Sequence, residues 1–204
     1  GRREGAGWIV GFMAARSHEI VPIAACPVLE PRLAAAPKVA LKLATRLGGS
    51  KPLDIQITAT DTGLDADIRG HGPLNDKGRL EAMIGLAAEI DLARLALHGE
   101  TLVERRPPLV RMGAASVSPP PGGFLQATAA GETKLAELVL DSVPPKAKRV
   151  ADLFSGCGPF ALRLAERAAV AAFDSDKAAI AALDRGWRNA KGLKTVAAEA
   201  RDLF

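Results

Sequence analysis

The chain has little of several residue types that whole classes of protein require. It contains no Tyr, and aromatic residues make up 4% of its 204 residues. Because single-strand binders stack bases on aromatic side chains, base stacking is not the main device expected here. The two cysteines, Cys26 and Cys157, lie far apart and do not suggest a secreted disulfide framework. We therefore expect a cytoplasmic protein.

A long apolar run is also missing. The longest, residues 20–29, is broken by Pro22 and Pro27, whereas a spanning helix needs about 20 apolar residues, so no membrane partner is expected. Apolar residues at 48% and charged residues at 25% instead indicate an ordinary globular chain. The net charge of +4 permits a polyanionic partner such as nucleic acid without identifying one. Basic residues such as Arg105 and Arg106 could contact phosphates, although a solvated surface is the ordinary interpretation.

The first part of the chain predicts an α+β domain. Residues 53–68 alternate apolar and polar side chains around the turn residues 61–63, which predicts an antiparallel hairpin. Its carboxylates lack the spacing of a calcium loop, so we expect them on a solvated strand face; they are Asp54, Asp61, Asp65 and Asp67. Helices are predicted over residues 31–47 and 80–90, and short strands over residues 92–97, 101–104 and 109–112.

A change of pattern follows residues 118–123, where three prolines and two glycines interrupt any regular element. We place a domain boundary there, giving an α+β domain over 1–123 and a second domain over 124–204. In the second domain we expect strands and helices in turn, over residues 149–154, 159–168, 169–173 and 175–190, after a helix near residue 135. Ser175 is the expected cap of the last helix. This alternation predicts an α/β fold with a parallel sheet.

The most informative stretch is a strand that runs into a glycine turn and a helix, at residues 150–160. Gly156 and Gly158, with Ala161, match the weak dinucleotide pattern G-x-G-x-x-A. Asp152, near the end of the strand, would repel a pyrophosphate but attract a cationic amino-acid group. S-adenosylmethionine has such a group and no phosphate. Asp174 lies at the spacing of an acidic residue that accepts hydrogen bonds from ribose hydroxyls.

Several motifs together resemble one family, the RNA uracil-5 methyltransferases, which make 5-methyluridine in 23S ribosomal RNA and in transfer RNA. They are DLFSGCGPF at 152–160, FLQAT at 124–128, the Asp174 strand end, and residues 188–193, 199–202, 10–12, 16–21 and 26–29. The resemblance covers most of the chain. It implies the first half of a Rossmann-like S-adenosylmethionine-dependent methyltransferase domain, preceded by an α+β central domain.

The resemblance also implies particular site residues. Beside Asp152, Gly156 and Gly158, it implies cofactor contacts at Gln126, Phe154, Pro159, Asp174 and Asp202. Gln126 taken alone would equally cap the helix that follows it. Cys26 is similar in position to the last of four cysteines that hold a [4Fe-4S] cluster in the ribosomal-RNA branch, whose other three would precede Gly1. A small buried thiol is the alternative for Cys26.

Catalysis at uracil C5 needs a cysteine thiolate that adds to C6 and a base that removes the C5 proton. Cys157 lies in the turn expected to hold the amino-acid end of the cofactor, so we do not assign it as the nucleophile. In the family both catalytic groups come on later strands, which we expect beyond Phe204. The chain starts at Gly1 without Met and stops within a βαβα series, so we expect a fragment that is inactive alone.

The function expected from these residues is methyl transfer from S-adenosylmethionine to C5 of a uridine in RNA, with ribosomal RNA favoured over transfer RNA. Two alternatives stay open. A nicotinamide-dependent oxidoreductase would use the same glycine turn, although Asp152 disfavours it. An RNA-binding module could keep a vestigial methyltransferase fold.

Overall fold

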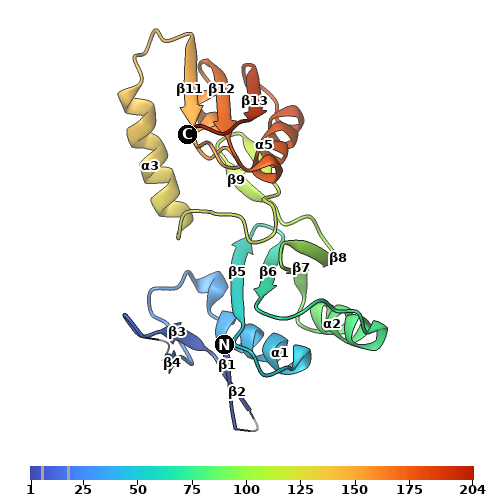
Figure 1. Ribbon diagram of the computed structural model, residues 1–204. Helices are drawn as coiled ribbons and strands as arrows, with labels where there is room; N and C mark the ends of the chain where they lie inside the picture. Colours follow the sequence, from blue (N-terminus) through green and yellow to red (C-terminus); the bar gives the residue numbers. More distant parts are fainter. Residues whose placement is uncertain (6, 18) are drawn as a thin grey trace. The chain divides into compact units, whose positions relative to one another are not determined.

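The computed structural model describes residues 1–5, 7–17 and 19–204, so residue 18 of the motif at 16–21 lies outside the described residues. The chain forms two compact units, Gly1–Pro108 and Leu109–Phe204. Figure 1 shows both units with most of their helices and strands labelled.

The first unit contains two small antiparallel hairpins, β1-β2 and β3-β4, and a four-stranded sheet in the order β5-β6-β7-β8. Its elements are β1 (Arg2–Glu4), β2 (Gly7–Ile9), β3 (Gly11–Met13), β4 (Ile20–Pro22), the short helix η1 (Pro31–Leu33), α1 (Ala36–Leu47), β5 (Asp54–Thr60), β6 (Gly63–Arg69), α2 (Lys77–Glu89), β7 (Leu92–Leu97) and β8 (Glu100–Glu104). The predicted α+β character is confirmed.

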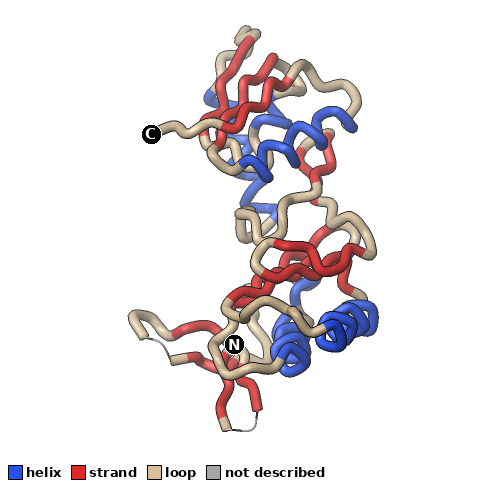
Figure 2. Tube along the Cα trace, turned by 45° about the vertical axis from the view of Figure 1, so that its right-hand side comes forward, coloured by secondary structure: helices blue, strands red, loops and turns tan. Residues whose placement is uncertain are grey.

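The four-stranded sheet is built around the predicted hairpin. β5 and β6 pair antiparallel from Asp54–Arg69 to Thr60–Gly63, so the predicted hairpin is confirmed, with its turn at residues 61–62 and Gly63, expected in the turn, already in β6. The chain then crosses through α2, and β7 pairs parallel with β6. α1 and α2 lie side by side against this sheet (Figures 1 and 2), and their apolar side chains, such as Leu43 and Met83, share one core with it. Each helix is stabilised mainly by burying the apolar side chains on its sheet-facing side.

The predicted solvated strand face is wrong for two of its four carboxylates. Asp65 and Asp67 are buried, whereas Asp54 and Asp61 are exposed. Asp65 accepts hydrogen bonds from Arg94 at 2.9 and 2.6 Å. Asp67 accepts from the side chain of Arg69 and from the Gly99 amide, both at 2.9 Å. The difference arises because β7 pairs with β6 and makes it an interior strand, whose polar side chains must find partners.

The second unit has a parallel sheet in the order β11-β12-β13, with a separate β9-β10 hairpin. Its elements are β9 (Val110–Met112), β10 (Ala115–Val117), α3 (Ala129–Ser142), β11 (Arg149–Leu153), α4 (Ala161–Leu164), β12 (Ala169–Asp174), α5 (Lys177–Asn189) and β13 (Val196–Ala200). The predicted alternation of parallel strands and helices is confirmed. In the part of the chain that the structure describes, no helix is long and apolar enough to cross a membrane.

Two local details of this unit differ from expectation. Asp176, not Ser175, caps α5, because its carboxylate accepts the amides of Ala178 and Ala179 at 2.8 and 3.1 Å. The helix expected over residues 159–168 is limited to α4. After α4 the coil tightens through i to i+3 bonds, including Glu166 N–H to the Arg163 carbonyl at 3.2 Å.

The two units divide after Pro108, earlier than the boundary predicted at residues 118–123. The reason is the β9-β10 hairpin, of which the sequence indicated only the first strand. Val117 of β10 packs on α5, where a Cβ at Gly186 would lie 2.7 Å from its Cγ2 atom. Met112 and Val117 are fully buried with side chains of α5. The proline-rich segment is therefore a connection inside the second unit.

Candidate cofactor site

The glycine loop leaves the sheet at the carboxyl end of β11. Ser155 donates its amide to the Phe173 carbonyl of β12 at 3.0 Å, which holds the loop at that edge. The turn before it is sharp, since Phe154 has φ of 59° although it is not glycine. Such a backbone is strained for a large side chain, and strain of this kind concentrates at functional sites. The ring of Phe154 is left 59% exposed.

Asp174 connects the end of β12 to the glycine loop. Its Oδ2 accepts the Gly156 amide, and its Oδ1 accepts the Asp176 amide, both at 2.8 Å. The carboxylate thus holds two turns together, a role that the sequence analysis did not include. Carboxylate oxygens have further lone pairs, so the bonds to these amides leave room for a hydroxyl donor. Acceptance of ribose hydroxyls by Asp174 stays a prediction.

Two buried polar atoms beside this loop have no partner among the described residues, Asp152 Oδ2 and Ser155 Oγ. A buried polar group without a hydrogen bond costs about 1–3 kcal/mol, so such atoms indicate a missing ligand or water. Burial raises the pKa of Asp152 to about 6; the Ala161 amide opposes this effect and the charge of Asp174 adds to it. A cationic group would stabilise the ionised carboxylate. The residues therefore fit the amino-acid end of S-adenosylmethionine, and Ser155 joins the predicted set.

The two glycines of the loop serve different purposes. A Cβ at Gly156, where φ is 53°, would meet no described atom within 4 Å, which leaves that side of the loop open. A Cβ at Gly158, where φ is 94°, would lie 2.7 Å from Cγ of Leu183 on α5. The side chain absent at Gly158 thus lets the loop and α5 pack closely. Cofactor contacts of both glycines stay predictions.

Cys157 is 3% exposed and packs in the core of the second unit. Burial raises the pKa of its thiol to about 12, and the charges of Glu132, Asp176 and Asp174 act in the same direction. A nucleophilic cysteine needs the opposite surroundings, because the thiolate is the reactive form. The burial and the raised pKa of Cys157 therefore argue against Cys157 as the nucleophile.

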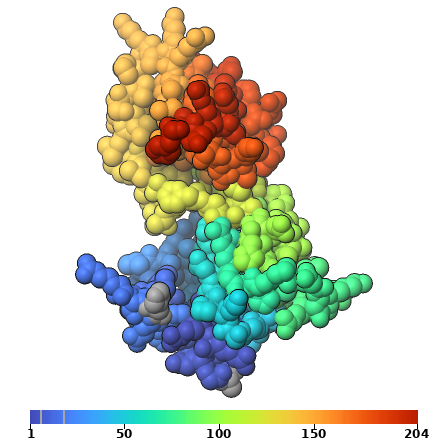
Figure 3. Space-filling view, in the orientation of Figure 1, coloured from blue at the N-terminus to red at the C-terminus, as the bar shows by residue number. Residues whose placement is uncertain are grey.

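The last predicted residues of this edge follow β13. Asp174 pairs in register with Ala200, so Asp202 comes shortly after the carboxyl end of the neighbouring strand. Asp202 is exposed. The ring of Phe204 lies 5.5 Å from that of Phe154, centroid to centroid. Figure 3 shows these C-terminal residues, in dark red, on the surface of the second unit. The contact of Asp202 with adenine stays a prediction.

Two further predicted contacts are Gln126, which comes before the glycine loop in the sequence, and Pro159, which is at its end. Gln126 precedes α3, but Thr128 is the residue that caps this helix, accepting the Gly131 amide at 3.0 Å. The alternative that Gln126 is the cap is therefore wrong. Pro159 closes the loop, and its carbonyl accepts a bond from Arg163 at 2.6 Å. Their cofactor contacts stay predictions.

Polar candidates in the first unit do not form a second site. Arg105 and Arg106 both donate to Asp91, at 2.7 and 2.8 Å, and hold the turn before β7. Cys26 is half-buried. The described residues contain no group of three or more side chains able to hold a metal ion. One cysteine does not hold a four-iron cluster by itself. The role of Cys26 as the fourth ligand of a cluster completed by other cysteines stays a prediction.

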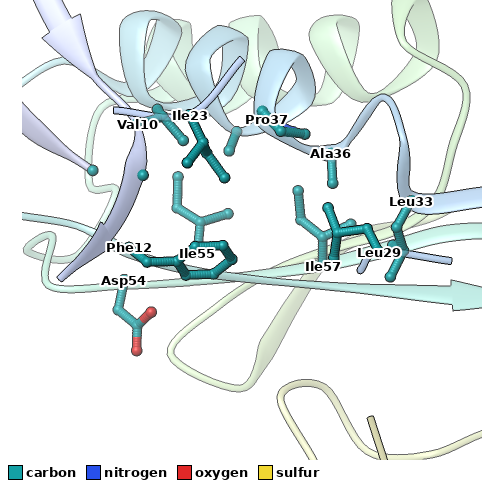
Figure 4. Close-up of a pocket in the computed structure, with 13 residues that line it drawn as sticks. Val10, Phe12, Ile23, Leu29, Leu33, Ala36, Pro37, Asp54, Ile55 and Ile57 are labelled. Atoms are coloured by element: carbon teal, nitrogen blue, oxygen red, sulfur yellow. The ribbon is translucent and has the colours of Figure 1, made fainter. Parts of the chain in front are cut away.

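A cavity of about 230 Å³ also lies in the first unit, between β3, α1 and β5. Figure 4 shows apolar side chains pointing into it, among them Phe12, Ile23 and Ile55, while the carboxylate of Asp54 points away. A nucleoside cofactor needs several convergent donors and acceptors as well as apolar surface. This lining fits it less well than the glycine loop does.

The chain aligns over its full length with proteins named RNA methyltransferases. It is 47% identical over 204 residues to an uncharacterized RNA methyltransferase of Brucella suis, covering 100% of the chain and 49% of that protein. It is 30% identical over 168 residues to the 23S rRNA (uracil(1939)-C(5))-methyltransferase RlmD of Tolumonas auensis, covering 79% of the chain and 38% of that protein. The resemblance to RNA methyltransferases is confirmed. This RNA methyltransferase homologue spans about half the length of the curated relatives it matches.

The fold agrees with this result. The Pyrococcus abyssi tRNA (uracil-54, C5)-methyltransferase, solved with S-adenosyl-L-homocysteine, superposes with a TM-score of 0.60 at 18% identity, covering 88% of the chain and 49% of that protein. The Rossmann-like methyltransferase fold predicted for this homologue is therefore confirmed. No protein-family model matches the chain.

Affinity for S-adenosylmethionine is expected to depend on pH through Asp152. Because its pKa is raised to about 6, Asp152 is mostly neutral at pH 5 and ionised at pH 7, and only the ionised form attracts the ammonium group. Affinity should rise about tenfold between pH 5 and 7. The folding stability of the ligand-free protein should change in the opposite direction. It should fall as the pH rises from about 4 to 6, because ionising this buried carboxyl group is unfavourable in the folded state.

Calorimetry across pH 5 to 7 measures this dependence. Asp152→Asn should bind more weakly at pH 7 and show a nearly flat profile, because the titrating group is gone. A flat profile in the unsubstituted protein would contradict the role of Asp152.

Proposed function

We propose that the protein containing this chain transfers a methyl group from S-adenosylmethionine to C5 of a uridine in RNA, in ribosomal rather than transfer RNA. The observation that carries the proposal is the buried, unpartnered carboxylate oxygen of Asp152 beside the glycine loop, among the described residues. Support for ribosomal RNA comes from the name of the Tolumonas auensis relative.

In this proposal the residues of this chain bind S-adenosylmethionine and orient it. Asp152 receives the ammonium group and Asp174 the ribose hydroxyls, at the carboxyl ends of neighbouring parallel strands. Phe154, which is exposed beside the loop, would offer an apolar contact to the cofactor. S-adenosylmethionine, when bound, supplies an electrophilic methyl group.

The uracil must be activated separately, by a thiolate that adds to C6 and a base that removes the C5 proton. Cys157 is unsuited to the first task because its burial disfavours the thiolate. We therefore retain the proposal that both groups follow Phe204 in a longer chain. The same proposal includes Cys26 as the fourth ligand of a [4Fe-4S] cluster in that longer chain.

The alternative of a nicotinamide-dependent oxidoreductase makes an opposite prediction about ligands. A diphosphate would be repelled by the carboxylate of Asp152 beside the loop, whereas the ammonium group of the cationic cofactor is attracted by it. We expect S-adenosylmethionine and S-adenosylhomocysteine to bind the full-length protein, and nicotinamide dinucleotide to bind at least about tenfold more weakly. Titration calorimetry with the three ligands decides between them, and tighter binding of the dinucleotide would overturn the proposal.

Methyl transfer distinguishes the enzyme from an RNA-binding module with a vestigial fold. Full-length protein is incubated with labelled S-adenosylmethionine and unmodified ribosomal or transfer RNA, and labelled 5-methyluridine is then measured. Label in ribosomal RNA is the expected result. RNA binding with cofactor binding but no label would favour the module.

A further inference from the structure

Arg163 occupies a position that the cofactor proposal does not use. It lies on α4, directly after the glycine loop, and its side chain is only 12% exposed. One terminal nitrogen, Nη1, donates to the Pro159 carbonyl at 2.6 Å. The other, Nη2, lies 2.9 Å from Oε1 of Glu132 on α3. A single planar side chain thus joins the end of the loop to a separate helix.

Glu132 borders the same loop. It stands in the first turn of α3, its side chain is 7% exposed, and its charge acts on the Cys157 thiol in the middle of the loop. A carboxylate so deeply buried needs a partner, because an isolated buried charge is very unfavourable. Arg163 is that partner, so the first turn of α3 is fixed against the loop.

The β9-β10 turn closes around Arg163 from a third direction. A Cβ at Gly113 would lie 2.9 Å from Cγ of Arg163 and 2.5 Å from Oε1 of Glu166. Glu166 in turn accepts the Ala114 amide at 3.1 Å. Gly113 has φ of 63°, so both its conformation and its lack of a side chain suit this close approach. The side chain of Arg163 has little freedom to move.

We propose that Arg163, paired with Glu132, is a positioning residue of the cofactor site, which holds the second half of the glycine loop in its binding conformation. The inference rests on the proposed S-adenosylmethionine site. The loop is anchored at both ends: Asp174 holds Gly156, and Arg163 holds Pro159. The stretch held by these two anchors, 156–159, includes three of the predicted cofactor contacts, Gly156, Gly158 and Pro159. Since α3 begins three residues after Gln126, the same ion pair also constrains the position of that predicted contact relative to the loop.

Arg163→Lys tests the proposal, because lysine keeps the charge beside Glu132 but has one nitrogen and cannot reach both acceptors. The matched control is Arg188→Lys on α5, whose ion pair with Asp184 at 2.7 Å is exposed. Each full-length variant is titrated with S-adenosylhomocysteine, well below its unfolding temperature. Hydrogen exchange of the backbone amides of Gly156, Cys157, Gly158 and Phe160 is measured without ligand; Pro159 has no amide hydrogen.

We expect Arg163→Lys to weaken binding about tenfold or more and to speed exchange of the loop amides, while Arg188→Lys changes neither by more than about twofold. A merely structural role would lower the melting temperature without these local changes. Should Arg163→Lys fail to fold, the double variant Glu132→Gln/Arg163→Gln leaves no unpaired charge and should show the same weakening. Binding and loop exchange equal to those of the control would overturn the proposal.

The outcomes separate this inference from the proposed function. If the unsubstituted protein does not bind S-adenosylhomocysteine, the proposed function fails and the cofactor role of Arg163 fails with it, whatever the exchange shows. If it binds and Arg163→Lys binds equally well, only the positioning role fails.

Discussion

Asp174→Ala is expected to weaken S-adenosylmethionine binding by about 1–3 kcal/mol, which corresponds to roughly five- to 160-fold. The substitution removes the acceptor of the Gly156 and Asp176 amides and, in the proposed function, the acceptor of the ribose hydroxyls. The loop would lose one of its two anchors, the hydrogen bond between the Gly156 amide and Asp174, and would be less ordered for binding the cofactor. Titration calorimetry on the full-length protein measures the effect.

Asp176→Ala provides the matched control, two residues away. Its carboxylate caps α5 through the Ala178 and Ala179 amides, and its removal leaves the bond between Asp174 and Gly156 in place. Loss of a cap costs about 1 kcal/mol of stability, so the melting temperature should fall while cofactor affinity changes little. Equal losses of affinity in the two variants would show that Asp174 acts only through general stability.

Arg94→Ala is expected to destabilise the first unit by about 3–5 kcal/mol. Arg94 and Asp65 form a two-point ion pair at 2.9 and 2.6 Å, with side chains only 5% and 8% exposed. Removing the guanidinium would leave the Asp65 carboxylate buried with its main partner gone. Urea unfolding monitored by circular dichroism gives the change in unfolding free energy.

Two further variants define what the pair contributes. Lys42→Ala removes a partner from an exposed pair with Glu89 at 3.0 Å, and should cost no more than about 1 kcal/mol. Asp65→Leu with Arg94→Met removes both charges and should recover much of the loss. If Arg94→Ala were no more harmful than Lys42→Ala, burial of the pair would not be what stabilises it.

Local chemistry in the sequence predicted most of the elements correctly. The alternation at residues 53–68 predicted β5 and β6 with their turn, because successive side chains of a strand point to opposite faces of the sheet. The glycine turn after a short apolar strand predicted the loop after β11, since few residues can make that turn. The choice between Ser175 and Asp176 as cap was not determined, because both residue types cap helices well.

The sequence indicated which residues belong to the candidate site, but not which hydrogen bonds they make. Asp152 and Asp174 were identified from spacing alone, since the ends of parallel strands share one edge of a sheet. Their partners were not, because Gly156, Ala161 and Asp176 act through backbone amides, which leave no mark in a sequence. Arg163 and Glu132 are 31 positions apart and show no local pattern.

What the sequence determined by itself is the order of most strands and helices after residue 31, the glycine turn and the resemblance to RNA methyltransferases, because these depend on residues near one another along the chain. Only the tertiary structure decided that Asp65 and Asp67 are buried, that the β9-β10 hairpin belongs to the second unit, and that Arg163 bridges Pro159 and Glu132. The physical reason is the same in each case. Burial and pairing of a polar side chain depend on neighbours that are distant in sequence, and those neighbours are brought close only by packing of the whole unit.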